Sequence, residues 1–405
     1  MMDHITDQIT MVTTMQPETH YSRSLCRALE AKTAVRILAE IDECNSQLPF
    51  RDVEQVFVPG EPLVRPLLAA IGRARNQVVH FQHEFNMFGG AAGIVRFLVL
   101  LYLVRRRGIR IVVTSHAVVI PTRIDQEFVM AFSMPPFRSI PGVIRLVFRV
   151  FYYSMGKLAD RITVHTDVMA QQLAQYYHVD PRKICTLPIG VDDPPARIEE
   201  PTERWASPLR GRPYALFFGY LLRRKGLDVL LDAFDQLKLR EPKALLVISG
   251  GELPNQRDYA RAIRERAAAS VHAADIIFTS FVSEDQIDWL FANASIVVLP
   301  YTVTVASGSL PLCFAMRFGR PVVASKTPPF EELNEKYPFI EMAITGNVSS
   351  LANAMADVMG DPERMERMTQ EAKRAASALS WSSVADRLCA IYQSLGAVGN
   401  SSVAD

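Results

Sequence analysis

Residues 296–325 read IVVLPYTVTVASGSLPLCFAMRFGRPVVAS and decide the fold. The runs IVVLP and PVVAS have the length and composition of short buried strands, and the segment between them can form a helix. Two strands that follow each other through a helix lie parallel in one sheet, because parallel pairing needs a long crossover. The stretch therefore predicts a parallel sheet covered by helices.

The loop before this helix has the composition of an anion-binding site. Ser307, Gly308 and Ser309 precede a helix that starts at Leu310, and Pro311 stands in the first turn, where proline is tolerated. Free backbone N–H groups and the helix dipole point at such a loop, and the serine hydroxyls add donors. The commoner alternative is a serine N-cap without a ligand.

Strand-like runs alternate with helix-like segments along almost the whole chain. The runs are residues 9–15, 34–41, 77–83, 110–114, 161–164 and 184–187, and then 214–218, 244–249, 275–279, 295–299 and 321–324. This alternation predicts the α/β class, and 405 residues are too many for one ordinary core. We therefore expect two doubly wound, Rossmann-like domains that face a central cleft, with ligands at the carboxyl ends of the strands.

The alternation breaks at residues 192–213, which are rich in proline and charge. We expect an N-terminal, acceptor-side domain at 1–195, a linker at 196–212 and a C-terminal, nucleotide-sugar-binding domain at 213–360. Residues 361–405 are expected to form helices that pack back on the N-terminal domain.

The composition excludes several classes of protein. The 44 basic and 43 acidic side chains balance, and no basic arm or Cys/His finger spacing occurs, so we expect no nucleic-acid partner. Five scattered cysteines indicate reduced thiols in a cytoplasmic protein. The start MMDHITDQ is not typical of a signal peptide, and the apolar run 94–104 is too short to span a bilayer.

The segment FFGYLLRRKGLD, residues 217–228, is a second candidate for anion binding. Gly219 ends a strand and allows close backbone approach, and Arg223, Arg224 and Lys225 concentrate positive charge beyond it. In a neutral protein this concentration suits a diphosphate. The alternative is an ordinary solvated turn.

Polar residues also follow the strands of the first half. His116 closes the run RIVVTS, and Glu84 follows VVHFQH, so both are expected at the cleft. His80 and His83 alternate to opposite faces and form no obvious metal pair. His20, after the first strand, is a weaker candidate. A structural role is the commoner alternative for a lone histidine after a strand.

Together these segments resemble the retaining GT-B glycosyltransferases of the "group 1" or family 4 kind. The likeness runs in order through VVHFQHEFNMFGG, VVTSHAVV, ADRITVHTDVMAQQL, KICTLPIGVD, FFGYLLRRKGLDVLLDAF, LLVISGGE, FTSFVSEDQIDWLFANASIVVLPY and SGSLPLCFAMRFGRPVVASKTPPFEEL. The resemblance implies a nucleotide-diphosphate sugar held mainly by the second domain and an acceptor bound mainly by the first. It implies retained anomeric configuration, no cofactor and no required metal.

The resemblance also assigns roles to single residues. Lys225 matches the family's phosphate-binding lysine, and Ser307, Gly308, Ser309 and Leu310 match the loop that holds the distal phosphate. His116 matches the histidine of the donor-sugar pocket, and with Lys225 it forms our catalytic pair. Phe281 and Val282 fall where the nucleobase meets backbone. The expected donor-side residues also include Gly219, Tyr220, Arg223 and Arg224, and the expected acceptor-side residues are His20, Glu84 and Asn86.

The sequence departs from the family pattern at several of its known positions. Ala306 and Phe314 replace the two glutamates of the E-x7-E pattern, and Tyr220 replaces a family arginine. PETHY at 17–21 replaces the usual glycine-rich loop. The chain therefore looks closer to a branch with an SG loop, in which the anion site is kept and the sugar and ribose contacts are rebuilt.

These features predict a retaining, metal-independent hexosyltransferase that uses a UDP- or GDP-linked sugar. The acceptor is a hydroxyl of a glycan, a lipid-linked molecule or a small natural product. Two alternatives stay open, namely a catalytically degenerate GT-B protein that binds a nucleotide sugar or a protein partner, and a sugar-nucleotide epimerase. Residues 140–161 combine basic and bulky apolar side chains. They fit a membrane-surface helix, giving peripheral membrane contact, or a core helix with its basic residues outward, which we prefer.

Overall fold

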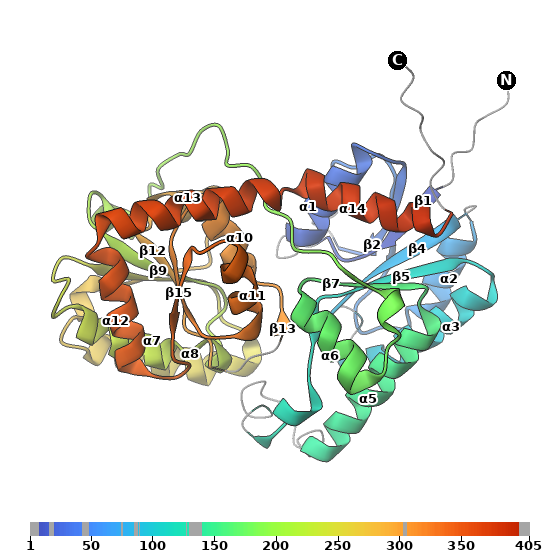
Figure 1. The fold of residues 1–405 in the computed structure, drawn as a ribbon, viewed down its shortest axis with the longest axis horizontal. Coiled ribbons are helices and arrows are strands. Elements are labelled where there is room, and N and C mark those ends of the chain that lie inside the picture. The colour runs from blue at the N-terminus through green and yellow to red at the C-terminus, as the bar shows by residue number, and fades with distance from the viewer. Residues whose placement is uncertain are drawn as a thin grey trace.

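The structure is a computed structural model. It describes residues 8–15, 20–42, 48–73, 76–84, 88, 90–126, 128, 140–302 and 306–396. Two parallel sheets of seven and six strands each carry helices on both sides, and they stand next to each other in the molecule (Figure 1). The expected architecture of two doubly wound, Rossmann-like α/β domains is confirmed.

The N-terminal sheet has the strand order β3-β2-β1-β4-β5-β7-β8, and every pairing in it is parallel. Its central strands are buried on both faces, as expected of a sheet covered on both sides. The strands are β1 (Gln8–Val12), β2 (Val35–Glu40), β3 (Val53–Phe57), β4 (Asn76–His83), β5 (Arg110–Ser115), β7 (Arg161–Val164) and β8 (Ile184–Thr186).

Helices of two groups cover this sheet. On one face lie α2 (Val64–Gly72), α3 (Gly90–Arg106), α5 (Pro141–Leu158) and α6 (Asp167–Tyr177), whose buried side chains share one core. On the other face α1 (His20–Glu30) packs with α14 (Trp381–Ser394), from the far end of the chain. The α6 helix begins at a threonine cap, since the Thr166 hydroxyl accepts a hydrogen bond from the Met169 N–H at 3.2 Å.

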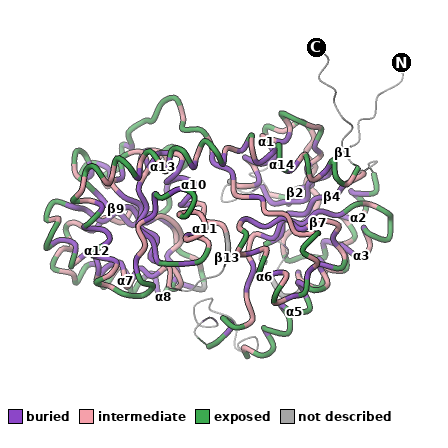
Figure 2. Tube along the Cα trace, in the orientation of Figure 1, coloured by how far each residue is buried: buried purple, intermediate pink, exposed green. Residues whose placement is uncertain are grey.

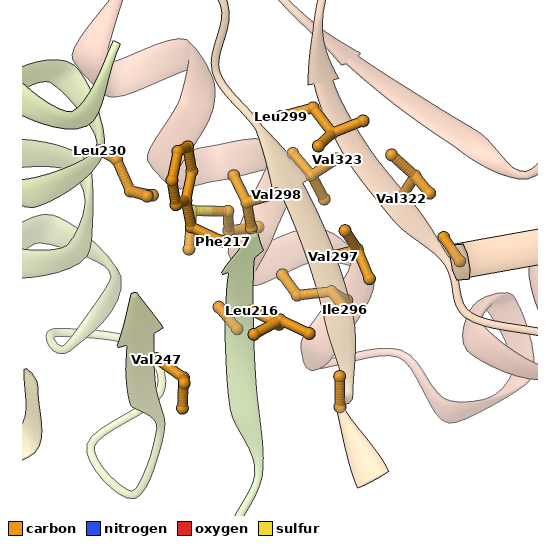
Figure 3. Packing of buried hydrophobic residues seen from close by; sticks show 14 of the residues in the cluster. Leu216, Phe217, Leu230, Val247, Ile296, Val297, Val298, Leu299, Val322 and Val323 are labelled. Atoms are coloured by element: carbon orange, nitrogen blue, oxygen red, sulfur yellow. The ribbon is translucent and has the colours of Figure 1, made fainter. Parts of the chain in front are cut away.

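The C-terminal sheet has the order β11-β10-β9-β12-β14-β15 and is also parallel throughout. The apolar runs that predicted β9 and β12 fill its centre, where Leu216 and Phe217 pack beside Val297 and Val298 (Figure 3). The strands are β9 (Tyr214–Phe218), β10 (Leu245–Ser249), β11 (Ile276–Ser280), β12 (Ile296–Leu299), β14 (Val322–Ser325) and β15 (Ile340–Ala343).

Helices connect these strands and enclose them. They are α7 (Leu227–Leu237), α8 (Arg257–Ala269), α9 (Glu284–Asn293), α10 (Leu310–Arg317), α11 (Pro328–Lys336), α12 (Val348–Met359) and α13 (Pro362–Ala378). The α9 helix starts with a capping box formed by Ser283 and Gln286, which satisfies two backbone N–H groups.

In the two large sheets the sequence reading missed two strands, β3 and β15. Each lies at an edge of its sheet, where it pairs on one side only. In β3 the sequence VEQVF has only one fully buried position, Phe57, and in β15 the sequence IEMA has two. These two edge strands therefore lack the continuous apolar run by which the central strands were recognised.

The chain passes between the domains at two adjacent places. The Val191 N–H donates to the Leu379 carbonyl at 2.8 Å, and the Trp381 N–H donates to the Val191 carbonyl at 3.3 Å. The indole ring of Trp381 lies so close to Gly190 that any Cβ there would overlap it. The crossing point is thus held by backbone pairing and by one large buried ring.

The C-terminal helices divide between the two domains. Met368, Ala372 and Ala375 of α13 belong to the C-terminal core, so α13 does not pack back on the N-terminal domain as we expected of residues 361–405. In α14, Trp381 and Leu388 belong to the N-terminal core beside α1. Figure 2 shows buried segments of both helices turned toward the sheets that they cover. The domain boundaries given above remain predictions.

Candidate active site

Three neighbouring strands of the N-terminal sheet end in polar residues. β4, β5 and β7 lie side by side, and Glu84, His116 and His165 are the first residues after them. The His116 N–H donates to the His83 carbonyl at 3.1 Å, which extends the β4–β5 pairing by one residue. Because parallel strands end at the same edge, the three side chains meet at one place.

The two histidines are hydrogen-bonded to each other. His116 Nδ1 lies 2.9 Å from His165 Nε2, and His165 Nδ1 lies 3.1 Å from the Leu187 carbonyl oxygen. Since a carbonyl only accepts, His165 carries its proton on Nδ1, and its Nε2 accepts the proton on His116 Nδ1. Burial lowers the pKa of His165 to about 4 and holds the pKa of His116 well below its usual range, so both rings are neutral at pH 7.

The other nitrogen of His116 also has a partner inside the protein. Its Nε2 lies 2.9 Å from an oxygen of the Gln82 side-chain amide. A neutral His116 with its proton on Nδ1 accepts at Nε2, so the Gln82 amide must turn its N–H group toward it. Tyr21 meets the His116 ring edge-on, with 4.7 Å between ring centroids. A sugar hydroxyl can reach His116 Nε2 only by displacing Gln82.

The two histidines within β4, His80 and His83, make contacts inside the N-terminal domain. His80 is buried between the Tyr392 hydroxyl at 2.6 Å and the Thr114 hydroxyl at 2.7 Å. His83 packs among aromatic rings on the opposite face of the sheet, and its ring centroid lies 4.6 Å from that of Phe97. Burial lowers the pKa of each to about 3. The predicted alternation of the two side chains to opposite faces of the sheet is confirmed.

The C-terminal domain contributes a buried lysine. Lys225 lies in the short helical turn Arg223–Lys225 after β9, and its Nζ occupies the space in which a Cβ of Gly219 would stand. Gly219 has φ +128°, a conformation that favours glycine, so it provides both the turn and the room. Nζ also lies 5.7 Å from the Tyr301 ring centroid. Burial, together with the neighbouring charge of Arg224, lowers the pKa of Lys225 to about 7.

The two arginines beside Lys225 have different surroundings. Arg224 faces the cleft, where burial lowers its pKa and Tyr301 and Glu84 of the other domain partly oppose that change. Burial in turn raises the pKa of Glu84, and Arg224 opposes that rise. The Arg223 guanidinium instead lies over the Tyr259 ring, 4.9 Å from its centroid. Of the two arginines predicted at the phosphates, only Arg224 is directed at the cleft.

The Ser-Gly-Ser loop meets the N-terminal domain directly. The strand β13 (Ala306–Ser307) pairs antiparallel with β6 (Ala117–Val118), which places Ser307 opposite Ala117, next to His116. A Cβ on Gly308 would overlap the Ile189 side chain and lie 3.3 Å from the His165 ring. Only glycine therefore allows the loop to approach so closely.

Ser309 occupies the N-cap position of α10. Its side chain makes no capping bond, and its hydroxyl lies 3.4 Å from that of Tyr301. The Leu312 and Cys313 N–H groups already donate to the Ser309 carbonyl, and Pro311 has no N–H. Among the described residues no backbone bond from the N–H of Ser309 or Leu310 is found, which leaves these two amides for an anion.

These groups surround one cavity of about 300 Å³ between the domains. The N-terminal domain and the crossing segment supply one wall, and the C-terminal domain supplies the other. The lining residues are Tyr21, Ser22, Glu84, His116, His165, Ile189, Arg224, Lys225, Tyr301, Gly308, Ser309, Leu310 and Pro311. The cavity thus combines two cationic side chains and a helix start with a wall of hydroxyl, imidazole and carboxylate groups.

The residues predicted near the nucleobase lie beside this cavity. The rings of Tyr220 and Phe281 are both close to Gly251, since a Cβ there would lie 3.6 Å from the first and 3.7 Å from the second. Phe281 is 66% exposed, whereas Val282 is buried. Ser280 directly precedes Phe281 and has φ +61°. This backbone conformation is rare for a residue with a side chain, and it turns the chain at this point.

Phe314, at the position of the second family glutamate, is a core residue. It is buried, and its ring centroid lies 5.2 Å from that of Phe291 and 5.9 Å from that of Phe218. This position is packed with apolar rings, so it offers no hydroxyl-binding group.

The sequence reading missed four polar residues of the cavity, namely Tyr21, Ser22, His165 and Tyr301. His165 follows the strand RITV just as His116 follows RIVVTS, so the same rule could have found it. Tyr301 likewise follows β12 after one proline. Tyr21 gave no such signal because it lies within a helix. Glu84 lines the cavity, the side chain of His20 is not described, and Asn86 lies outside the described residues.

Two family models match the chain, one in each domain. The model "Glycosyltransferase Family 4" matches residues 19–193, and "Glycosyl transferases group 1" matches residues 199–375. The chain belongs to the group 1 glycosyltransferases. The resemblance drawn from the sequence motifs is thereby confirmed at the level of the family.

Relatives of the group 1 glycosyltransferases match at low identity. The alpha-D-kanosaminyltransferase of Streptomyces kanamyceticus is 29% identical over 216 residues, which are 50% of this chain and 51% of that protein. The MMP alpha-(1->4)-mannosyltransferase of Mycolicibacterium hassiacum is 25% identical over 301 residues, 72% of this chain and 67% of that protein. The match thus spans about half to two thirds of the length of these relatives.

Solved structures of similar fold cover nearly the whole chain. Anabaena Alr3699/HepE in complex with UDP and glucose has a TM-score of 0.74 at 17% identity, covering 96% of this chain and 100% of that one. Sucrose-phosphate synthase from Thermosynechococcus elongatus has a TM-score of 0.69 at 16% identity, covering 96% and 99%. At these identities the likeness shows the fold alone.

The described residues contain neither a cluster of metal-binding side chains nor a helix that could span a membrane. No group of three or more His, Cys, Asp or Glu side chains there could hold a metal ion. Within the same residues no helix is both long and apolar enough to span a membrane.

Proposed function

We propose that this protein is a retaining glycosyltransferase that moves a hexosyl group from a UDP- or GDP-linked sugar to an acceptor hydroxyl. One observation carries the proposal: Lys225, Arg224 and the start of α10 converge on the cavity that His116 lines from the other domain. A nucleotide-diphosphate sugar has its negative charge beside its reacting carbon, and this cavity has the matching distribution of groups. The solved structure of similar fold with UDP and glucose supports the same class of donor.

The C-terminal domain would hold the leaving diphosphate. As the glycosidic bond breaks, negative charge grows on the leaving phosphate oxygen, and Lys225 and Arg224 lie where they can stabilise it. The N–H groups of Ser309 and Leu310 add fixed dipoles. Donors that are preorganised for developing charge are commonly worth about 3–4 kcal/mol each. The nucleobase would lie beyond them, near Tyr220, Phe281 and the backbone at Val282.

The N-terminal domain would orient the sugar. His116 Nε2 exchanges Gln82 for a sugar hydroxyl, while the bond from its Nδ1–H to His165 fixes the ring and its tautomer. Because both imidazoles are neutral, this pair positions the sugar by hydrogen bonding without adding positive charge beside the oxocarbenium-like carbon. Charge stabilisation is thus confined to the phosphate side of the cavity.

We favour transfer on the front face, in which the leaving phosphate helps to remove the acceptor proton. Glu84 is the one carboxylate among the described residues that line the cavity, and its neighbouring charge is Arg224. A carboxylate that faces an arginine is a weak nucleophile, so a covalent intermediate on Glu84 is disfavoured. Glu84 instead suits the acceptor side, where it can accept a hydrogen bond from the attacking hydroxyl.

Turnover of candidate donors tests the proposal. The purified protein is incubated with UDP- and GDP-linked hexoses, and release of the nucleotide is followed without and with acceptors. We expect slow hydrolysis of one donor, which Lys225→Ala reduces by about 100-fold or more. Lys326→Ala removes a lysine whose side chain is 61% exposed, and it serves as the matched control with normal turnover. Binding without turnover would instead indicate a degenerate relative, and inversion at C2 an epimerase.

A further inference from the structure

Exposed apolar side chains concentrate on two helices of the N-terminal domain. Nine large ones, with exposed fractions from 38 to 63%, lie on α3, on α5 or directly before α5: Val95, Val99, Tyr102, Ile140, Val143, Leu146, Val147, Val150 and Tyr153. The other exposed large apolar residues that the structure describes are scattered singly along the chain. A contiguous apolar surface of this size marks an interaction site.

The nine side chains form one surface because the two helices are neighbours. Both α3 and α5 pack on the same face of the N-terminal sheet and contact each other, as Figure 1 shows. The sides turned away from the sheet carry positions 95, 99 and 102 of α3 and 143, 146, 147 and 150 of α5, which is helical spacing. We call this surface the α3–α5 face, and Figure 2 shows its exposed positions in green.

Positive charge surrounds the apolar residues. Residues 90–110 contain five arginines and residues 140–158 contain two arginines and one lysine, and neither segment contains an aspartate or glutamate. Arg105 and Arg110 share one nearby carboxylate, Asp160, at 3.8 and 3.5 Å. Among the described ion pairs none involves Arg106, Arg149 or Lys157. In a chain of net charge +1 this is a strong local excess.

A groove beside the face is also basic. A cavity of about 460 Å³ runs between α2 and α3, lined by Arg65, Arg96 and Arg107 together with apolar side chains such as Leu68 and Leu103. Among the described residues that line this groove there is no carboxylate. Arginines above an apolar floor suit a phosphate group that carries acyl chains.

We propose that the α3–α5 face binds the surface of a bilayer that contains anionic phospholipids. Apolar side chains would enter the headgroup boundary while the arginines and Lys157 stay near the phosphates, the arrangement of an interfacial helix. The expected core helix with its basic residues outward describes only part of this segment, because Leu146 and Val150 are also 61 and 51% exposed. The helix buries Phe148 and Phe151 on its inner side and is apolar on its outer side as well.

The α3–α5 face begins at the edge of the sheet where the cavity lies. Helices that follow parallel strands start at the carboxyl edge of the sheet, and α3 and α5 both begin at the edge where Glu84 and His116 lie. A docked bilayer would therefore border the acceptor side of the cleft. From this position we infer that the acceptor is a membrane lipid or a lipid-linked sugar, an inference that rests on the proposed function.

Sedimentation with vesicles tests the face without using catalysis. We expect the full chain to bind vesicles of phosphatidylcholine and phosphatidylglycerol at least about tenfold more tightly than vesicles of phosphatidylcholine alone, and to lose that binding as salt is raised. The double variant Leu146→Glu/Val150→Glu should weaken binding about tenfold or more. Arg149→Gln/Lys157→Gln should weaken it by a similar factor, since it removes two charges and keeps the apolar surface.

A matched control uses a leucine and a valine that are even more exposed, in the other domain. Leu239 and Val271, in the C-terminal domain, are 82 and 89% exposed, so Leu239→Glu/Val271→Glu should leave vesicle binding unchanged. Hydrolysis of the soluble donor should be normal in Leu146→Glu/Val150→Glu, which separates lipid docking from the transferase activity. The proposal is overturned by absent binding, by equal binding to both vesicles, or by an equal loss in the control. Dimers that dissociate in Leu146→Glu/Val150→Glu, with no lipid binding, would assign the face to a second copy instead.

Discussion

Binding of a nucleotide-diphosphate sugar should depend on pH through one lysine. Burial and Arg224 lower the pKa of Lys225 to about 7 in the free protein. A diphosphate beside its Nζ stabilises the ammonium form and raises that pKa again. Binding above pH 7 must therefore be accompanied by uptake of a proton.

The pKa of Lys225 determines how strongly the affinity for the donor depends on pH. Below pH 7 Lys225 is already charged, so affinity should be nearly constant from pH 6 downward to the limit of the fold. Above pH 7 affinity should fall about tenfold per pH unit until the pKa of the complex is reached, because each unit corresponds to about 1.4 kcal/mol. At pH 8.5 only about 3% of the free protein carries the proton, so the loss relative to pH 6 is about 30-fold.

Calorimetry with UDP-glucose and GDP-mannose from pH 6 to 8.5 measures this dependence, since the diphosphate of these donors does not titrate in that range. Lys225→Arg keeps its charge throughout and should give a flat profile, although its planar head changes the contact geometry. The neighbouring His165, with a pKa of about 4, is neutral across the range. An affinity of the native protein that stays constant to pH 8.5, or a Lys225→Arg profile that falls in the same way, would refute the reasoning.

Three further outcomes are expected. Gly308→Ala should weaken nucleotide binding by about tenfold or more, because its Cβ overlaps Ile189, and Gly308→Ala/Ile189→Ala should recover much of that loss in the same calorimetric assay. His116→Ala should lower kcat by about 100-fold with little change in nucleotide affinity or Tm; a loss of about 1–3 kcal/mol of stability with normal turnover would show that His116 only ties down the strand ends. Turnover should survive EDTA, since Lys225, Arg224 and the α10 amides hold the diphosphate, and a strict need for Mn²⁺ or Mg²⁺ in a rate assay would contradict this.

Most of the fold could be predicted because its central strands are continuous apolar runs. Apolar runs such as LFF in β9 and VVL in β12 can be buried almost completely only in the middle of a sheet that helices cover on both faces. The edge strands β3 and β15 could not be recognised, because half of their surface faces water and their sequences are mixed. The division of α13 and α14 between the domains depends on long-range packing that helical periodicity does not report.

The position of the site was predictable, but the direction of its side chains was not. A polar residue after a parallel strand must lie at the carboxyl edge, which is why His116, Glu84 and Lys225 are together. Whether Arg223 or Arg224 faces the cleft depends on the backbone of one short turn, and the RRK triplet alone does not determine it. The bond between His116 and His165 joins positions 49 residues apart, and only the pairing of β5 with β7 makes them neighbours.

The anomeric configuration of the first product tests the central claim most directly. The donor that turns over is hydrolysed inside the NMR tube without acceptor, and the anomeric proton of the released sugar is followed before mutarotation. The proposed front-face transfer, in which Lys225 holds the leaving phosphate and Glu84 is the one carboxylate among the described residues that line the cavity, predicts that an α-linked donor releases the α-anomer first. Release of the β-anomer first would contradict the account, since water would then have attacked from the opposite face.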